Sequence, residues 1–413
     1  MQNLTAAGPL MEKYSKLLNR LACPKCHEYI SFSNAVSINS QPFFAGLACK
    51  KCGTVGSLSN GRAIFTAGSP VNLPDREENL SGAISRKVLQ IESGMRNPEI
   101  AWTSTGHTTW SETANSRFEF NTSAIGVAVH FLKHPWSGKV RVYLNDQLNA
   151  EIDLLEEAGS MQLWHPIFVG LKPSKISIEV LGQANEKSKG TQVHLVSYEE
   201  LSVASHETPS YTYEHCNFGN PYPQKFMDML SSASPDALVL DCGSGDRNYP
   251  DPRVIGLEYS MFQAPDLFGD GHQLPFKDNS FDLILSQAVV EHLHDPFTGA
   301  REIIRVLKPG GTVYVESAFM QPLHAVPFHF FNTTGWGLER LFSDLDIQEV
   351  THEGQLRDTL NWFYNLTALR TKGFADKVDE LLSIAGELDS HITAEELRYF
   401  SSFVTLTGLK SVA

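Results

Sequence analysis

The chain has 413 residues, too many for one compact domain at about 150 residues each, and its 42% hydrophobic and 19% charged residues are typical of globular protein. The formal net charge of −14 disfavours a protein that coats nucleic acid or anionic lipid. No apolar run reaches the roughly 18 residues of a membrane span, and Glu12, Lys13 and Arg20 stand where a signal peptide would be apolar. We therefore expect an acidic, cytoplasmic protein of several domains with no membrane span.

Four of the six cysteines form two C-x-x-C pairs, Cys23-Pro-Lys-Cys26 and Cys49-Lys-Lys-Cys52, which are separated by 22 residues. Two such pairs can converge on one tetrahedral ion, and four thiolates leave no open position for catalysis. A redox pair, disulfides or coincidence are the alternatives, and disulfides are the weaker one because no signal peptide directs the chain to an oxidising compartment. We predict a structural Zn²⁺ site.

The sequence around these cysteines resembles the zinc ribbons that are attached to, or partner, some methyltransferases. Leu21–Cys26 and Leu47–Gly53 carry the resemblance, and Asn60–Phe65 stands where those modules have a short strand. The resemblance implies a zinc-ribbon domain over residues 1–68. A segment rich in proline, charged and small residues follows, which predicts a linker over residues 69–85.

Residues 86–205 alternate apolar and polar side chains with a period of two, which predicts β-strands. Turn residues separate the runs at intervals of roughly ten residues, as in a β-sandwich or jelly roll. The clearest runs are Phe118–Asn121, Gly126–Phe131, Lys139–Leu144 and Lys175–Val180. Four tryptophans of this domain either fill its core or stack on sugar rings, as in carbohydrate-binding jelly rolls. They are Trp102, Trp110, Trp136 and Trp164.

Residues 206–413 alternate strands with helices, which predicts an α/β domain on a mostly parallel sheet. The buried strand Ala237–Leu240 ends in Asp241-Cys-Gly-Ser-Gly245. Glycines at this point let the backbone approach a ligand, although such a pair can equally be a simple tight turn. The next strand ends in Glu258, where a carboxylate can accept hydrogen bonds from ribose hydroxyls. Two prolines in Asp246–Arg253 exclude the usual full-length helix between these strands.

A longer series of motifs then follows, and it is far more specific than the glycines. It consists of Gly269–Phe276, Asn279–Gln287, Val290–Pro296, Arg301–Gly311 and Thr312–Glu316. In this series the chain resembles class I S-adenosylmethionine-dependent methyltransferases of the type 11 group, which share the pattern D-x-x-x-LPF, FD, EH and RVLKPGG. The resemblance covers about residues 218–370 and implies a Rossmann-like fold for the C-terminal domain. The same pattern predicts a helix over 297–307 and a strand over 312–316.

The resemblance also implies S-adenosylmethionine as the cofactor. Asp270 would meet the adenine amino group, Glu258 the ribose hydroxyls, and Gln287 the methionine and methyl group. The residues after the first strand would line the methionine and ribose side. The full implied set is Asp241, Gly243, Gly245, Glu258, Asp270, Gly271 and Gln287.

Methyl transfer is an in-line displacement that often needs a base to take a proton from an oxygen or nitrogen nucleophile. Histidine suits this role by its pKa. In methyltransferases with a similar insert, the segment corresponding to residues 319–334 lies over the substrate opening. We predict His324, and after it His329, as the base; the alternative is that both only pin this loop. His292, with Glu291, is expected to start the next helix and shape the pocket. A helical insertion at about 357–399 is expected to cover the substrate.

The predicted function is therefore methyl transfer to oxygen or nitrogen of a small molecule or glycan. The alternatives are a protein or RNA methyltransferase recruited through the zinc ribbon, and a binding protein with an inactive methyltransferase fold. Residues 206–413 hold 14 Lys or Arg and 29 acids, a net charge of −15, which disfavours nucleic acid at this domain. Residues 1–70 hold 7 Lys or Arg and 2 acids, a net charge of +5, and suit an acidic or anionic partner.

Overall fold

The computed structural model of this protein divides into two compact units. Unit 1 consists of residues 1–220 and 245–270, and unit 2 of residues 221–244 and 271–413. Among the described residues, none of the helices has the length and apolar character to cross a membrane. The structure describes residues 7–65, 78–80, 83–91, 102–105, 108–157, 159–204, 211–212, 220–247, 249, 251–262 and 264–412.

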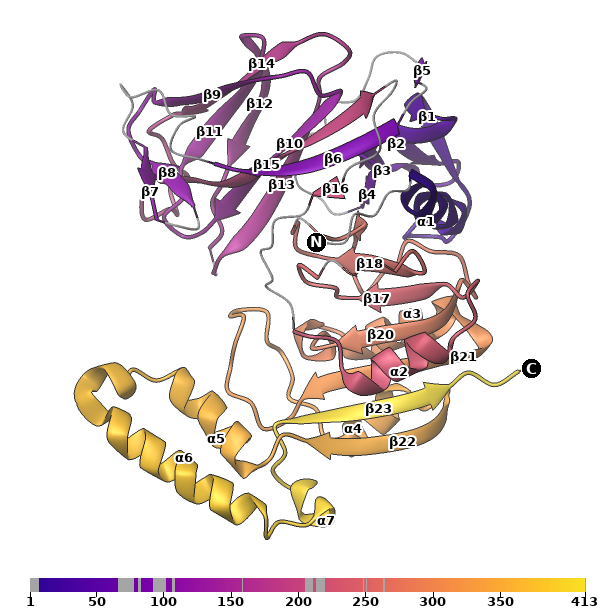
Figure 1. Ribbon diagram of the computed structural model, residues 1–413, viewed down its shortest axis with the longest axis vertical. Helices are drawn as coiled ribbons and strands as arrows, with labels where there is room; N and C mark the ends of the chain where they lie inside the picture. Colours follow the sequence, from indigo (N-terminus) through magenta and orange to yellow (C-terminus); the bar gives the residue numbers. More distant parts are fainter. Residues whose placement is uncertain are drawn as a thin grey trace. The chain divides into compact units, whose positions relative to one another are not determined.

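The first part of unit 1 is a helix followed by a small sheet (Figure 1). Its elements are α1 (Ala7–Arg20), β1 (Ile30–Ile38), β2 (Gln41–Cys49), β3 (Gly53–Ser59), β4 (Arg62–Ile64) and β5 (Glu78–Leu80). Strands β1 to β4 pair antiparallel in chain order, and β5 pairs in parallel with β1. Much of the predicted linker 69–85 lies outside the described residues, but β5 falls within it.

This sheet continues into strands from much further along the chain. β4 pairs in parallel with β19 (Leu267–Phe268), and β19 pairs in parallel with β18 (Val254–Glu258). Helix α1 contacts β18, and Lys13 forms an ion pair of 2.7 Å with Asp266. The described part of the segment between β17 (Val239–Cys242) and β18 contains no helix, as its prolines predict. The N-terminal helix therefore covers a strand that lacks a helix of its own.

The rest of unit 1 consists of two further sheets. Their strands are β6 (Ala83–Gln90), β7 (Thr103–Ser104), β8 (Thr109–Ser111), β9 (Arg117–Thr122), β10 (Gly126–Lys133), β11 (Lys139–Leu144), β12 (Gln147–Asp153), β13 (Met161–Phe168), β14 (Ser174–Val180), β15 (Val193–Ala204) and β16 (Tyr211–Thr212). One sheet has the order β13-β10-β15-β6-β16, in which β8 also pairs with β15 and β7 pairs with β8, and the other has the order β12-β11-β14-β9. All four runs of alternating residues that predicted strands are strands here; the jelly-roll topology stays a prediction.

One hydrophobic core joins the inward faces of these two sheets. Val127, Val129 and Phe131 of β10 lie in the same cluster as Ile176 and Ile178 of β14. Each set follows the period of two that places alternate side chains on one face of a strand. The tryptophans of this domain differ in burial. The fully buried ones belong to this core, and others reach the surface: Trp102 is 7% and Trp164 0% exposed, whereas Trp136 is 49% exposed.

Unit 2 is an α/β structure whose sheet has the order β22-β23-β21-β20-β17. Its elements are α2 (Gln224–Ser232), β17, β20 (Phe281–Gln287), the short helix η2 (Val290–His292), α3 (Pro296–Val306), β21 (Leu307–Ala318), α4 (Gly335–Leu341), β22 (Asp346–Glu353), α5 (Leu356–Asn365), η3 (Arg370–Phe374), α6 (Ala375–Asp389), α7 (Ala394–Leu397) and β23 (Phe403–Leu409). Strands β17, β20 and β21 are parallel, and β23 runs antiparallel between β21 and β22.

Helix α3 confirms the predicted helix to within one residue at each end. Asp295 caps its N-terminus by accepting a hydrogen bond of 3.1 Å from the backbone N–H of Thr298, and Pro296 occupies the first helical position. The following strand begins at Leu307 and not at Thr312 as predicted. Leu307 already has extended backbone angles and pairs with Phe281, so the glycines of the Lys308–Gly311 segment interrupt a strand and do not precede it.

Helices α5 and α6 contact each other and form a hairpin between β22 and β23 (Figure 1). The hairpin buries Val378, Leu382 and Ala385 of α6 at a helical spacing. It also leaves large apolar side chains exposed, which are Trp362, Phe363, Leu366, Phe374, Leu381, Ile384 and Leu388.

Candidate functional site

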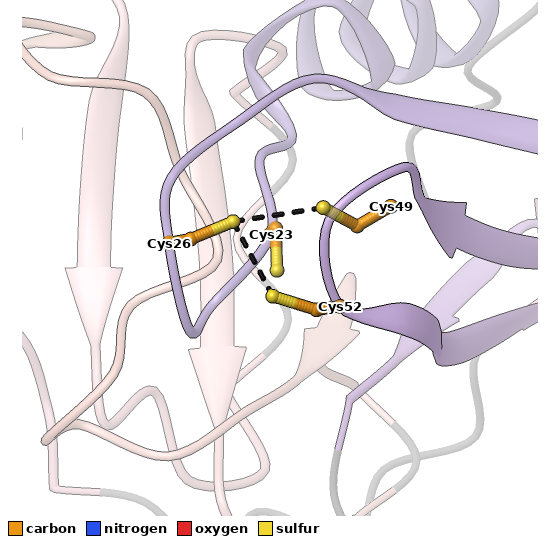
Figure 2. Close-up of side chains that lie close together, drawn as sticks. All are labelled: Cys23, Cys26, Cys49 and Cys52. Carbon is orange, nitrogen blue, oxygen red and sulfur yellow. Dashed lines mark hydrogen bonds between the residues drawn. The ribbon is translucent and has the colours of Figure 1, made fainter.

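The four predicted metal-binding cysteines lie together in unit 1. The chain turns at Cys23 and Cys26 before β1, and at Cys49 and Cys52 between β2 and β3, and the two turns bring the sulfurs to one point (Figure 2). All four Sγ atoms lie within 4.8 Å of one another, and Cys26 Sγ lies 3.5 Å from both Cys49 Sγ and Cys52 Sγ. Zinc–sulfur bonds of about 2.3 Å in a tetrahedron place sulfurs roughly 3.8 Å apart, so the donor set suits Zn²⁺.

The thiols of this cluster influence one another. Burial alone raises the pKa of Cys49, but backbone N–H groups and the neighbouring thiols lower the pKa to about 7. Hydrogen bonding with Cys26 instead raises the pKa of Cys52 to about 12. Adjacent sulfurs cannot all ionise unless a cation lies between them, because each new thiolate repels the others.

In unit 2, three of the implied cofactor-binding residues lie at or just past the carboxyl ends of adjacent parallel strands. Asp241 pairs with Leu285, so Gln287 is two residues further along β20 at the same edge of the sheet. Asp241 is fully buried and accepts a hydrogen bond of 2.7 Å from the hydroxyl of Tyr222. Gln287 donates to Glu316 Oε1 at 3.2 Å. The third residue, Gly243, directly follows β17.

Gly243 has a backbone that only glycine adopts readily. Its φ is 83°, and a Cβ atom would lie 2.2 Å from Cγ2 of Val289. Any side chain here would displace Val289, which precedes η2. The local packing therefore requires a glycine at this position. This agrees with both interpretations of the motif, a tight turn and a cofactor-binding loop.

Gly245, Glu258 and Asp270 belong to unit 1. The Gly245 backbone N–H donates to Glu258 Oε2 at 2.7 Å, and Oε1 accepts from the N–H groups of Tyr259 and Ser260 at 2.8 and 3.1 Å. Glu258 is thus held by three backbone donors at the end of β18. Asp270 is half-buried.

In unit 2, the loop that begins at Gly271 is fixed by helix α3. Arg305 donates to the backbone carbonyls of Leu274 and Phe276 at 2.9 and 2.7 Å. Glu302 accepts from the N–H of Leu274 at 2.8 Å and pairs with Arg305 at 2.7 Å. Glu302 and Arg305, which precede the Lys308–Gly311 segment, therefore anchor the loop that contains Leu274–Phe276.

The predicted histidines lie in the loop after β21, next to the residues that follow β20. Ring centroids of His324 and His329 are 4.3 Å apart, and those of His292 and His324 are 5.2 Å apart. His329 uses both nitrogens: Nδ1 accepts from the His324 backbone N–H at 3.3 Å, and Nε2 lies 2.7 Å from Asn332 Oδ1. His324 contacts Trp362 of α5 at 5.8 Å between rings.

Beside these histidines lies the buried carboxyl group of Glu291, which the sequence predicts to start the next helix and shape the pocket. Glu291 is 1% exposed, and burial raises its pKa to about 7. Ser317 Oγ and the Ala318 N–H are its polar neighbours, each at 3.4 Å. Sequence reasoning missed Tyr222 and Glu316: the pairing of β20 with β21 brings Glu316 to Gln287, and the segment before α2 brings Tyr222 to Asp241.

Comparison with known proteins identifies the class of one segment. Residues 253–315 match the family model described as a methyltransferase domain. This segment contains β18, β19, β20 and α3, together with most of β21. This segment of the chain is therefore similar to a methyltransferase domain.

Two relatives and one solved structure illustrate the range of similarity. The chain is 43% identical over 58 residues to the uncharacterized protein YafE of Escherichia coli, covering 14% of this chain and 28% of that protein. It is 41% identical over 106 residues to a demethylmenaquinone methyltransferase of Streptomyces griseus, covering 22% of this chain and 46% of that protein. The chain therefore spans less than half the length of these relatives.

The solved structure is a geranyl diphosphate C-methyltransferase of Streptomyces coelicolor, in complex with Mg²⁺, geranyl diphosphate and S-adenosyl-L-homocysteine. It shares 16% sequence identity over 45% of this chain and 76% of its own, with a TM-score of 0.31. So weak a superposition adds nothing to the assignment.

Proposed function

We propose that this protein is an S-adenosylmethionine-dependent methyltransferase that acts on oxygen or nitrogen of a small molecule. The observation that carries the proposal is the methyltransferase-domain match over residues 253–315, with acceptor side chains at the strand ends around it. The domain boundaries 1–68, 86–205 and 206–413 belong to the same proposal. The cofactor supplies a methyl group on a sulfonium, which needs no further activation.

The residues proposed to bind S-adenosylmethionine match its chemistry. The ammonium group, the ribose hydroxyls and the adenine amino group of the cofactor are all hydrogen-bond donors. Asp241, Glu258 and Asp270 supply the carboxylates that such donors need. Gly243, Gly245 and Gly271 keep the backbone beside them free of side chains, and Gln287 offers a neutral amide toward the methionine side.

On the acceptor side, we propose that His324 takes the proton and that His329 positions it. Nδ1 of His324 lies 3.1 Å from the Pro322 carbonyl, which leaves Nε2 as the basic nitrogen. Both nitrogens of His329 are engaged, so its role is to hold the loop. The loop and the nearby hairpin expose apolar side chains, which favours an acceptor with an apolar part over a bare glycan. These loop residues are Met320, Leu323, Val326, Phe328, Phe330 and Phe331.

The cysteine cluster is proposed to hold a structural Zn²⁺ ion. None of Cys23, Cys26, Cys49 and Cys52 forms a disulfide, and the four converge as a closed ligand set. Thiolates of this kind persist in a reducing compartment, so a cytoplasmic location is part of the proposal. The basic residues of the same module suit an acidic protein partner.

Calorimetric titration with S-adenosylmethionine tests the cofactor site. We expect the wild-type protein to bind with micromolar affinity, and Asp270→Asn to bind at least about ten-fold more weakly, because a hydrogen bond to a charged group contributes about 1.5–3 kcal/mol. Asp376→Asn, an exposed aspartate of α6, is the matched control and should bind as the wild type does. Absence of binding to the wild-type protein would contradict the proposal and favour a binding protein with an inactive fold.

A transfer assay with methyl-labelled cofactor then tests the acceptor class. We expect label in apolar phenols, quinols or amines, and little in RNA or protein. Label found mainly in protein or RNA would instead favour recruitment of a macromolecule through the zinc ribbon.

A further inference from the structure

A second group of potential metal ligands lies in unit 2, apart from the cysteines. One carboxylate oxygen of Glu291 and one ring nitrogen each of His292 and His324 lie within 4.8 Å of one another. Glu291 and His292 are adjacent in η2, and His324 reaches them from the loop after β21. Two imidazoles and one carboxylate form a ligand set for divalent transition metals that leaves coordination positions open.

Hydrogen bonds to the backbone fix which nitrogen of each ring can bind an ion. His292 Nδ1 lies 2.7 Å from the Phe328 carbonyl, and His324 Nδ1 lies 3.1 Å from the Pro322 carbonyl. A carbonyl oxygen only accepts, so each Nδ1 carries the proton and each Nε2 keeps its lone pair. Neither Nε2 has a hydrogen-bond partner among the described residues. Metal-binding histidines commonly donate their other N–H to a carbonyl in this way, which orients the ring.

The rest of the cluster supports the same conclusion. His329, the remaining histidine, has both nitrogens occupied and holds the His324 backbone in place. The Glu291 carboxylate accepts from Ser317 Oγ and from the Ala318 N–H at 3.4 Å each, and both contacts lie near the upper limit of hydrogen-bond length. Bonds of about 2.1 Å in a tetrahedron place ligand atoms roughly 3.4 Å apart, so the present atoms must approach one another by up to about 1.4 Å, which small side-chain rotations supply.

We infer that Glu291, His292 and His324 bind a divalent transition metal ion, such as Zn²⁺, Co²⁺ or Fe²⁺, with open positions for the oxygen of the methyl acceptor. Coordination lowers the pKa of a bound hydroxyl, whose proton passes to solvent, and the oxygen then attacks the sulfonium methyl group. The carbon–sulfur bond breaks and the neutral thioether leaves. The ion would carry one net positive charge after binding one carboxylate and two neutral imidazoles, which suits an anionic oxygen.

The role of the ion rests on the proposed function and changes it in one respect. An ion on His324 Nε2 occupies the lone pair that a general base would use. His324 then acts as a ligand, and the ion replaces it in activating the acceptor. Metal binding itself needs neither cofactor nor acceptor, so it can be measured independently.

The test uses the full chain with zinc already on its cysteines, titrated with Co²⁺. We expect one further ion to bind, with the weak visible absorption of nitrogen and oxygen ligands and without sulfur-to-cobalt charge-transfer bands. His292→Ala and Glu291→Gln should each weaken Co²⁺ binding at least about ten-fold. His391→Ala, an exposed histidine of the same unit, is the matched control and should bind Co²⁺ as the wild type does.

Thermal melting of each variant, followed by circular dichroism, separates lost ligands from lost folding. Failure of the folded wild-type protein to bind Co²⁺ at high micromolar concentration would overturn the inference. So would wild-type affinity in both variants. Either result leaves the cofactor titration unaffected, whereas a chain that binds Co²⁺ but not S-adenosylmethionine keeps the metal site and contradicts the proposed function.

Discussion

Two clusters of buried polar groups differ in how completely they are satisfied. In unit 1, Arg62 donates to both oxygens of Glu199 at 2.7 Å and to the Pro265 carbonyl at 3.0 Å, and its guanidinium lies 5.0 Å from the Trp164 ring. Arg62 is 1% exposed and Glu199 0% exposed. In unit 2, Glu291 is equally buried, yet its two neighbouring histidines keep lone pairs that no described residue uses.

We call the first cluster closed, because its buried charges have partners. We call the second cluster open, because Nε2 of His292 and of His324 has no hydrogen-bond partner among the described residues. Burial raises the pKa of Glu199, but Arg62 and Arg86 outweigh burial and hold that pKa below its usual value. Burial also raises the pKa of Glu291, and there the hydrogen bonds from backbone N–H groups and Ser317 and the charge of His329 are too weak to offset it. Closed clusters stabilise a fold, because each buried charge already has its partners. Open clusters near a loop are candidates for ligand binding. Deleting a residue should therefore unfold the first kind and weaken ligand binding in the second.

The largest effect is expected at the closed cysteine cluster. Cys26→Ala should abolish zinc binding and unfold the surrounding segment, because zinc contributes about 10–16 kcal/mol to the folding of zinc-finger peptides. Metal analysis and limited proteolysis measure this, and cleavage should appear between residues 21 and 65. Lys50→Ala, an exposed neighbour of Cys49, should keep both the metal and the protease resistance. A Cys26→Ala protein with full zinc content would contradict the closed-site interpretation.

The second effect concerns the buried arginine. Arg62→Ala leaves Glu199 charged and buried without its bidentate partner, which should lower the free energy of unfolding of unit 1 by about 3–5 kcal/mol. Chemical denaturation of the full chain measures it. Arg141→Ala removes an ion pair with Glu151 whose side chains are 40% and 44% exposed, and it should leave the free energy of unfolding nearly unchanged because solvent screens this pair. Equal losses of unfolding free energy in Arg62→Ala and Arg141→Ala would contradict the distinction between buried and exposed ion pairs.

The smallest effect is expected at the strand ends of unit 2. Tyr222→Phe removes the hydroxyl that donates to Asp241, and the loss of one hydrogen bond of about 1 kcal/mol should weaken S-adenosylmethionine binding about five-fold. Calorimetry measures the affinity, and Tyr399→Phe at an exposed position is the control. If the Tyr222→Phe protein has a lower melting temperature but binds S-adenosylmethionine as the wild type does, the hydrogen bond between Tyr222 and Asp241 stabilises the fold and does not contribute to cofactor binding.

Local patterns allowed much of the fold to be predicted. Period-two alternation predicted β9, β10, β11 and β14, and apolar residues at helical spacing before the Lys308–Gly311 segment predicted α3, because these elements depend on nearby residues alone. The short strand β19 and the helix α1 that covers β18 had no such signal. Their place depends on pairings between segments about 200 residues apart, which no local pattern encodes.

The candidate sites also differ in how far the local sequence predicts them. The cysteine spacing is a local property, and the structure brings all four sulfurs together. The pairing of Glu291 with His324 joins two loops at the ends of β20 and β21, so the sequence indicated each residue but not their proximity. The roles of the seven implied cofactor residues stay predictions until the titration is made.

The parallel pairing of Ala63–Ile64 with Leu267–Phe268 has a consequence for how the chain folds. A ribosome must add about 200 residues after β4 before its partner strand exists. Contacts of such long range are slow to form, since a large loop must close first. During synthesis β4 is an unpaired sheet edge, which invites pairing with other chains. A metal ion that holds the first four strands together would keep that edge in order until β19 emerges.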